Sequence, residues 1–171
     1  MTTPLPSLPQ IKPKMLLLID HDSCSGCQSC VLACSLTKTG IFSPTRSRVA
    51  IKKWEDQCLS IPVLCEHCNS PPCVPVCPTS AISKNPETGI VASNQELCTG
   101  CRACAAACPY GPETVHFVDN KAVLCDLCDG NPQCARICQQ MAIAYMPTTI
   151  AAQYKKRRLA ETRRKALQRP R

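Results

Sequence analysis

Aromatic side chains are scarce in this sequence of 171 residues, which contains one Trp, two Phe and three Tyr. Large aromatic rings usually fill much of a hydrophobic core, so a conventional core would be thin here. The length fits one ordinary domain or two very small ones. Inorganic groups could therefore fill part of the interior in place of large side chains.

Long apolar runs are also missing. No stretch reaches the roughly 18 apolar residues of a membrane span. The run Met15–Ile19 is too short for the apolar part of a signal peptide, and four prolines precede it. We therefore expect a protein of the reducing cytoplasm, where thiols are more often metal ligands than disulfides.

Common signatures of enzymes are absent from the sequence. It contains no G-x-G-x-x-G motif, no G-K-[ST] phosphate loop and no nucleophile elbow. The C-x3-C-x2-C spacing of radical enzymes is missing as well. We expect that the chain is not an enzyme and that catalysis takes place on a partner chain.

Cysteine, by contrast, is abundant, with 17 residues. The stretch Cys98–Pro109 has the spacing C-x2-C-x2-C-x3-C-P, which binds a cubane iron-sulfur cluster. Its first three thiolates lie on one tight loop and can reach three corners of one cube. The fourth, Cys108, ligates the neighbouring cluster when such runs occur in pairs. The run therefore predicts partner runs elsewhere in the chain.

Three further cysteine runs are present. The first, Cys24–Cys34, repeats the same spacing but has Ser35 in place of the proline. The second, Cys65–Pro78, and the fourth, Cys125–Cys138, have longer third gaps. Sixteen cysteines thus predict four 4Fe-4S clusters with four ligands each. We interpret the remaining one, Cys58, as a buried or incidental thiol.

Chain order predicts how the runs pair. The second and third runs are adjacent, so they should exchange their fourth cysteines, and the first and fourth runs must then pair across the chain. The predicted ligand sets are Cys24, Cys27, Cys30 and Cys138 for cluster A; Cys125, Cys128, Cys134 and Cys34 for cluster B; Cys65, Cys68, Cys73 and Cys108 for cluster C; and Cys98, Cys101, Cys104 and Cys77 for cluster D.

The repeating unit is a hairpin, a cysteine run and a short helix. Four such units predict an α+β fold in which one ferredoxin-like module is inserted into another. The expected parts are an extended arm at 1–14, an outer module at 15–64 and 112–147, an inner module at 65–111 and a basic helical tail at 148–171.

Four residues near the ligands could tune the clusters. Gly26 and Gly100 would let backbone amides approach a cube closely. Arg102 lies between two ligands and could raise the potential of its cluster, or it could simply be exposed on the loop. His67, between Cys65 and Cys68, could donate a hydrogen bond to a sulfide.

The tail carries the whole net charge of +8. Residues 1–150 contain eleven basic and eleven acidic residues, whereas residues 151–171 contain nine basic residues and one acid, Glu161. Such a run is often a solvated face. The sharper hypothesis is that it docks on an acidic surface of a catalytic subunit or of another copy of this chain.

The four runs in order, with the details Cys65-Glu-His-Cys68 and Cys98-Thr-Gly-Cys101, resemble the four-cluster subunits of molybdenum and tungsten oxidoreductases, formate hydrogenlyases and carbon monoxide dehydrogenases. The resemblance implies an electron-transfer wire of four 4Fe-4S clusters. It also implies a tungsten or molybdenum pterin partner, and the small size is most similar to the ferredoxin subunit of tungsten aldehyde oxidoreductases. A flavin-containing, NAD-linked subunit could be the second partner.

Two other functions fit parts of the pattern. Paired C-x2-C motifs and a basic tail could describe a zinc protein that binds nucleic acid. A tetrahedral zinc ion, however, needs four ligands that converge on one point. The third and fourth cysteines of a run are so closely spaced that the four thiolates of the run would not all reach it. A free polyferredoxin without a stable partner would contain the same clusters.

Overall fold

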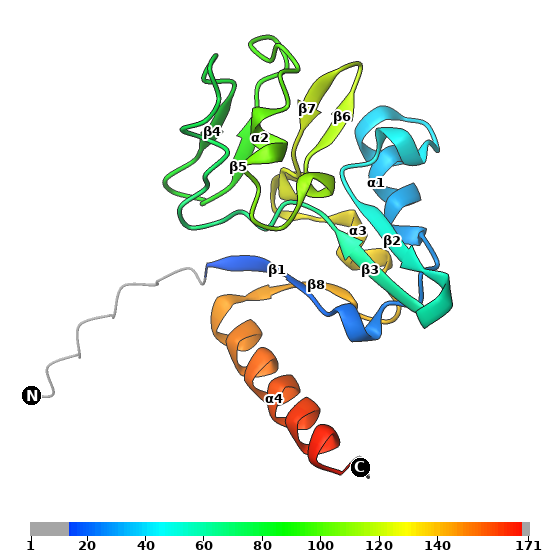
Figure 1. The fold of residues 1–171 in the computed structure, drawn as a ribbon. Coiled ribbons are helices and arrows are strands. Elements are labelled where there is room, and N and C mark those ends of the chain that lie inside the picture. Colours follow the sequence, from blue (N-terminus) through cyan, green and yellow to red (C-terminus); the bar gives the residue numbers. More distant parts are fainter. Residues whose placement is uncertain (1–13, 169–171) are drawn as a thin grey trace, which may run out of the picture. The chain divides into compact units, whose positions relative to one another are not determined.

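The computed structural model describes residues 14–168, so the expected N-terminal arm lies outside the described residues except for Lys14. It shows a small mixed α+β fold with short hairpins (Figure 1). Residues 17–145 form one compact unit. The described part of a second unit consists of residues 14–16 and 146–168.

The strands pair two by two. The chain's ends supply one sheet, β1 (Met15–Ile19) with β8 (Ile143–Pro147). The other three sheets are antiparallel hairpins: β2 (Ala50–Trp54) with β3 (Leu59–Val63), β4 (Ile82–Lys84) with β5 (Val91–Ser93), and β6 (His116–Val118) with β7 (Lys121–Val123). The repeat predicted a hairpin before each of the four runs. Three are present, whereas β1, which precedes the first run, pairs with β8 instead.

The backbone conformation of its turn explains how the β6–β7 hairpin closes tightly. Asp119 and Asn120 both have positive φ, 49° and 61°. Two consecutive left-handed residues make the turn that matches the twist of a hairpin, and Asp and Asn tolerate this conformation better than most residues.

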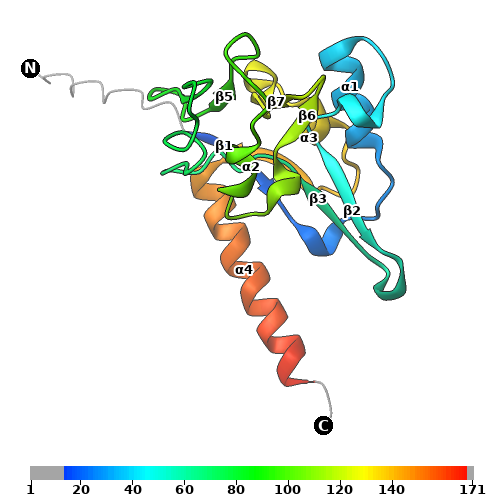
Figure 2. The same cartoon turned by 45° about the horizontal axis from the view of Figure 1, so that its top comes forward.

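Short helices begin within three of the four cysteine runs. They are α1 (Ser29–Thr39), α2 (Ala103–Ala106) and α3 (Gln133–Ile137), and α1 packs against α3 (Figure 2). In the described chain no helix follows the second run, where residues 72–76 form turns instead. The expectation of a helix there is wrong. Pro71, Pro72 and Pro75 lack the N–H groups that a helix needs and obstruct its preceding turn.

Two hydrophobic cores contain cysteines among their buried residues. One is built by Leu17, Cys30, Val31, Cys34, Val49, Leu64, Cys125, Leu127, Cys134 and Ile143. The other is built by Ile82, Val91, Cys104, Ala105, Val115, Ala122 and Leu124. No aromatic residue is fully buried in either core, and Cys65 packs against both.

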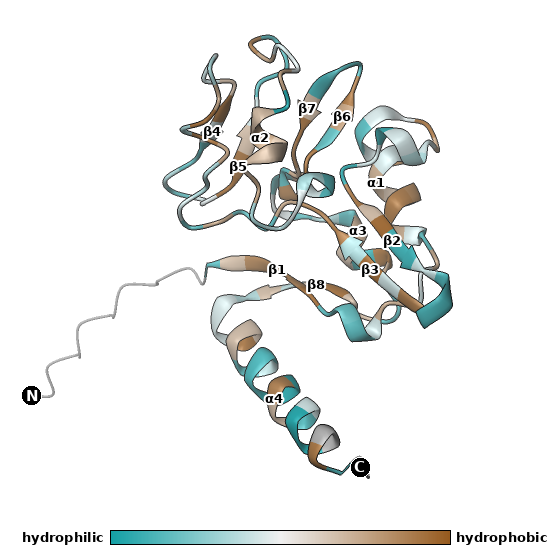
Figure 3. Cartoon of the chain, in the orientation of Figure 1, coloured by the Kyte–Doolittle hydropathy of each residue, from teal (hydrophilic) through white to brown (hydrophobic). Residues whose placement is uncertain are grey.

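The C-terminal helix α4 (Thr148–Leu167) is predominantly hydrophilic along its length (Figure 3). Lys155, Lys156 and Arg157 are exposed on it, and Arg157 pairs with Glu161 at 3.1 Å. None of the helices among residues 14–168 has the length and apolar character needed to cross a membrane.

Candidate metal centres

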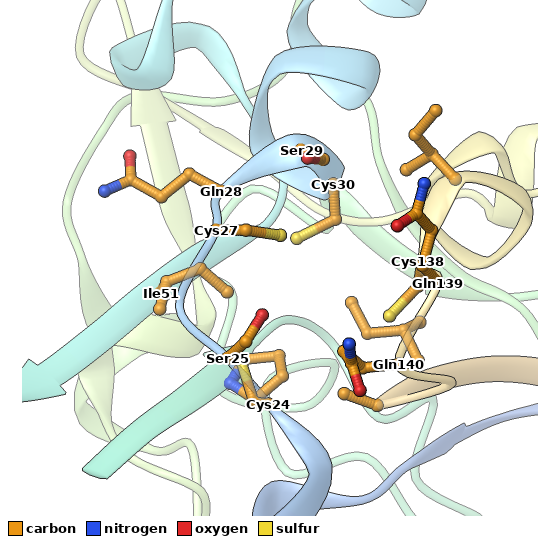
Figure 4. Close-up of a pocket in the computed structure, with 14 residues that line it drawn as sticks. Cys24, Ser25, Cys27, Gln28, Ser29, Cys30, Ile51, Cys138, Gln139 and Gln140 are labelled. Atoms are coloured by element: carbon orange, nitrogen blue, oxygen red, sulfur yellow. The ribbon is translucent and has the colours of Figure 1, made fainter. Parts of the chain in front are cut away.

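Four cysteines surround a cavity of about 210 Å³ (Figure 4). Cys24, Cys27 and Cys30 come from the first run, and Cys138 approaches from the end of α3. Burial raises the pKa of the Cys30 thiol to about 12, and repulsion from the other three thiolates adds to the rise. We call these four residues group A.

A second set of cysteines lies together in the first core. Burial raises the pKa of Cys134, as does repulsion from Cys125, Cys34 and Cys128. Burial also raises the pKa of Cys125 to about 12, with further repulsion from Cys34 and Cys128. These four residues, group B, combine three thiols of the fourth run with the last thiol of the first.

A third set joins the second run to the last cysteine of the third. Burial raises the pKa of Cys73, with repulsion from Cys108 and Cys68. Burial raises the pKa of Cys65 to about 12, again with repulsion from Cys73 and Cys68. We call Cys65, Cys68, Cys73 and Cys108 group C.

The remaining cysteines of the runs form group D. Burial raises the pKa of Cys104, with repulsion from Cys98 and Cys101. Cys77 packs against the same core as Cys98. Four thiolates held close together repel each other strongly, and irons bound between them would relieve that repulsion. The donor set of each group therefore fits an iron-sulfur cluster.

Backbone amides donate hydrogen bonds to sulfurs of groups B and D. The N–H groups of Arg48, Ala81 and Ala122 donate to Cys34, Cys77 and Cys98 at 3.3, 3.2 and 3.3 Å. The N–H of Leu127 donates to Cys125 at 3.4 Å. Such hydrogen bonds stabilise the thiolate, which is the form that binds a metal.

Hydroxyl groups donate hydrogen bonds to the thiols of Cys27 and Cys77. The hydroxyl and N–H of Ser29, together with the hydroxyl of Ser25, lower the pKa of Cys27. For Cys77, desolvation acts upward on the pKa, but hydrogen bonds from Thr79 and from neighbouring backbone amides outweigh it and lower the pKa. Both thiols are thereby favoured as thiolates.

Gly26 and Gly100 lie at equivalent places in the first and third runs, with φ of +70° and +76°. A Cβ on Gly26 would lie 2.5 Å from the Ser60 hydroxyl, and one on Gly100 would overlap the carbonyl oxygen of Asn120. Each glycine therefore lets a cysteine loop lie directly against a hairpin. The expected approach of amides to a cube stays a prediction.

The His67 ring lies between the second core and Cys65. Its Nδ1 accepts a hydrogen bond from the N–H of Val91 at 3.0 Å and lies 4.0 Å from Cys65 Sγ. Burial lowers the pKa of His67 to about 4, so the ring is neutral and its proton is on Nε2. That atom is buried without a hydrogen-bond partner among the described residues. The expected hydrogen bond from His67 to a cluster sulfide stays a prediction.

Arg102 and Cys58 are both exposed. Arg102 is exposed, has φ 64° just before α2 and places its guanidinium 5.0 Å from the ring centre of Phe117. Cys58 is interpreted from the sequence as a buried or incidental thiol. It is exposed in the turn between β2 and β3, so the first of these alternatives is wrong.

Sequence reasoning missed three charged residues beside group B. Asp126 lies between Cys125 and Cys128 and forms ion pairs with Lys38 and Arg48. The only signal in the sequence is a carboxylate between two ligands, because the two cations come from distant segments.

No three His, Cys, Asp or Glu side chains within residues 14–168 are arranged to bind a single metal ion. A cube differs from a single ion in that each of its four thiolates binds a separate iron, so the thiolates need not converge on one point.

Comparison with known families covers all four cysteine runs. Residues 56–143 match the 4Fe-4S dicluster domain, and residues 21–40 match a 4Fe-4S binding domain. The chain belongs to the 4Fe-4S dicluster ferredoxin family. Membership confirms the prediction of 4Fe-4S clusters, for which the sixteen cysteines of the runs supply enough ligands for four. It also decides against the zinc interpretation.

Several relatives are named as subunits of oxidoreductases. The chain is 38% identical to the polyferredoxin-like subunit of aliphatic sulfonate oxidoreductase from Pyrococcus furiosus, over 77% of this chain and 75% of the relative. It is 37% identical to a tetrathionate reductase subunit from Salmonella typhimurium, over 66% of this chain and 47% of the relative. The chain thus spans three quarters of the first relative and about half of the second.

Among solved structures, the fold is similar to a chain in the active-site complex BamBC of benzoyl coenzyme A reductase. Sequence identity is 23%, the TM-score is 0.45, and the match covers 77% of this chain and 76% of that one.

The dicluster family relationship establishes the general role. The chain is an iron-sulfur electron-transfer subunit of an oxidoreductase complex, and the prediction that catalysis belongs to another chain is confirmed by its relatives. Its 4Fe-4S clusters, when bound, accept and release single electrons.

Proposed function

We propose that this chain carries electrons through four 4Fe-4S clusters arranged in a line between a catalytic subunit and a second redox partner. Group A would bind cluster A, group B cluster B, group C cluster C and group D cluster D, as the exchange of fourth cysteines predicts. The proximity of thiols from paired runs in groups A, B and C supports this assignment.

The proposed order rests on one observation: thiolates of neighbouring groups lie close enough to repel each other. Cys134 of group B lies close enough to Cys30 of group A for their charges to repel. The charges of Cys65 in group C and Cys125 in group B also repel each other. The charges of Cys73 in group C and Cys104 in group D repel each other as well. These neighbours support the linear order A, B, C, D.

The exposure of two thiols supports groups A and D as the two ends of this line. Among the sixteen cysteines of the runs only Cys27 and Cys101 are exposed. Cys27 belongs to group A and Cys101 to group D, so electrons would enter and leave at the two terminal groups. Groups B and C lie between them. Cys34, Cys125 and Cys134 of group B are buried, and the cysteines of group C are half-buried.

We propose nested modules as the domain organisation, with residues 65–111 inserted between 15–64 and 112–147. The first core supports this division, because its members come only from the two outer segments. The second core combines inner residues such as Ile82 and Val91 with Val115, Ala122 and Leu124 from the β6–β7 region.

For the catalytic partner we propose a tungsten or molybdenum pterin subunit, with a tungsten aldehyde oxidoreductase as the specific candidate. The resemblance of the four runs supports this class, and the Pyrococcus relative is a subunit of another oxidoreductase. A flavin-containing, NAD-linked subunit is the proposed second partner. A relative named as the beta subunit of an NADH-dependent phenylglyoxylate dehydrogenase supports it. The proposed compartment is the cytoplasm.

The basic tail, residues 151–171, is the proposed docking segment toward an acidic surface of the catalytic subunit or a second copy. Lys155, Lys156, Arg163 and Arg164 are exposed on α4, while Glu161 is the only acid in the tail. Reversing these four charges to Glu should release the partner or lower the assembly mass at physiological salt. An unchanged mass would remove this part of the proposal.

Anaerobic purification of the tagged chain from its native cells tests the main proposal. We expect about sixteen irons and a similar amount of labile sulfide per chain, together with a larger subunit that contains tungsten or molybdenum. Far less iron would contradict the four-cluster wire. Full iron without any companion at low salt would favour the alternative of a free polyferredoxin.

A further inference from the structure

One carboxylate and two cations form a partly buried ion cluster beside group B. Asp126 Oδ2 lies 2.7 Å from Lys38 Nζ and 2.5 Å from Arg48 Nη1. The side chains of Lys38, Arg48 and Asp126 are 15%, 23% and 30% exposed. We call these three residues the Asp126 ion cluster.

Each member is connected to a cysteine of group B. Asp126 Oδ1 accepts a hydrogen bond from the N–H of Cys128 at 3.0 Å. Arg48 donates its own N–H to Cys34 Sγ at 3.3 Å. Lys38 lies one helical turn after Cys34 on α1 and close enough to Cys128 for their charges to attract. The ion cluster is therefore part of the surroundings of both segments that supply group B.

The net charge of these three residues is +1, because two cations share one carboxylate. An iron-sulfur cluster becomes more negative by one charge when it is reduced, so a nearby positive charge favours the reduced state and raises the reduction potential. Partial burial makes this effect larger than that of a solvent-screened pair. By contrast, the pair Lys52–Glu113 is almost half exposed on both sides.

We propose that Lys38 and Arg48 raise the reduction potential of cluster B and that Asp126 limits this rise while holding both cations in place. The proposal rests on the assignment of group B as the ligands of cluster B. Cluster B is an interior step of the proposed wire, so its potential affects every electron that passes. Lys38, Arg48 and Asp126 are positioning residues that act on the cluster through space.

The opposite signs of the charges give a direct test. Asp126→Asn removes a negative charge and should raise the midpoint potential of one of the four clusters. Lys38→Gln removes a positive charge and should lower the midpoint of that same cluster. The double variant should return it close to the wild-type value. The measurement is an EPR-monitored redox titration of the anaerobically isolated complex.

Two matched variants separate charge from structure. Arg48→Lys keeps the charge and should leave the midpoint near the wild-type value, whereas Arg48→Gln should lower it. Asp129 lies exposed in the same loop as Asp126. Asp129→Asn removes the same charge at a solvated position and should move the midpoint less than Asp126→Asn does.

Iron content is measured first for every variant. If the wild type contains four clusters and the variants retain their iron, midpoints that stay fixed or shift in the same direction for Asp126→Asn and Lys38→Gln would overturn this inference alone. If the wild type itself contains far fewer irons, the proposed function fails instead. A variant that loses iron is replaced by Arg48→Gln, for which an unchanged midpoint counts against the inference.

Discussion

The Nδ1 atom of His67 accepts a hydrogen bond from the backbone N–H of Val91 at 3.0 Å. This contact orients the ring and leaves the proton on Nε2, which is buried without a partner in the described part of the chain. An unsatisfied buried donor costs about 1–3 kcal/mol. The cost would disappear if a cluster sulfur accepted a hydrogen bond from Nε2, which is the bond expected from the sequence.

Replacing His67 by Ala should lower the midpoint potential of one cluster. A hydrogen bond to sulfur stabilises the more negative, reduced state, and the substitution removes it. The measurement is an EPR-monitored redox titration. His21→Ala, at an exposed position outside the runs, is the control and should change no midpoint. Equal midpoints in the wild type and in His67→Ala would show that His67 makes no such bond.

Ligand loss should follow the exchange of fourth cysteines. Cys138→Ser and Cys30→Ser affect the same proposed cluster, so the double variant should lose about four irons in total. Cys138→Ser with Cys134→Ser affects two clusters although both residues belong to one run, and should lose about eight. Iron analysis and EPR spin counting provide the measurement.

The control for these variants is Cys58→Ser, which should retain all of the iron because Cys58 is exposed outside the four groups. Losses in the reverse pattern, with the larger loss for the pair Cys30 and Cys138, would mean that each run binds its own cluster.

The loop glycines should differ in how strongly they resist substitution. Gly40→Ala should cost about 1 kcal/mol, because φ is +74° but the space around it is open. Gly100→Ala should cost about 2–4 kcal/mol, because strain adds to overlap with the Asn120 carbonyl. Denaturant midpoints of the holoprotein, followed by loss of visible absorption, measure the difference. Similar midpoints for the two variants would argue against close packing of this loop on the hairpin.

Removal of iron and sulfide should unfold most of residues 17–145. The two cores contain no fully buried aromatic residue, and cysteine thiols make up a large share of their members. Metal binding therefore contributes a large part of the folding free energy. Far-UV circular dichroism and amide hydrogen exchange should show loss of structure in the apoprotein and recovery after anaerobic reconstitution. A cooperative thermal transition in the apoprotein would contradict this expectation.

Local features were the most predictable from the sequence. The three hairpins follow from alternating apolar residues and turn residues such as Asp119 and Asn120, whose conformational preferences act over a few positions. The helix expected after the second run is the clear error. The repeat seen in the other runs predicted a helix there, but Pro71, Pro72 and Pro75 remove the donors that a helix requires.

Apart from the exchange of fourth cysteines between runs, contacts between distant segments could not be predicted. The spacing of the cysteines by itself determined the cofactor, because each loop must bring three sulfurs to one cube through fixed covalent geometry. Only the tertiary structure decided that Arg48 and Lys38 meet Asp126 and that Asn120 lies against Gly100. It also decided that only Cys27 and Cys101 among the run cysteines reach the surface. These relations depend on how separate loops and hairpins pack, and packing energy is shared among many residues far apart in the sequence.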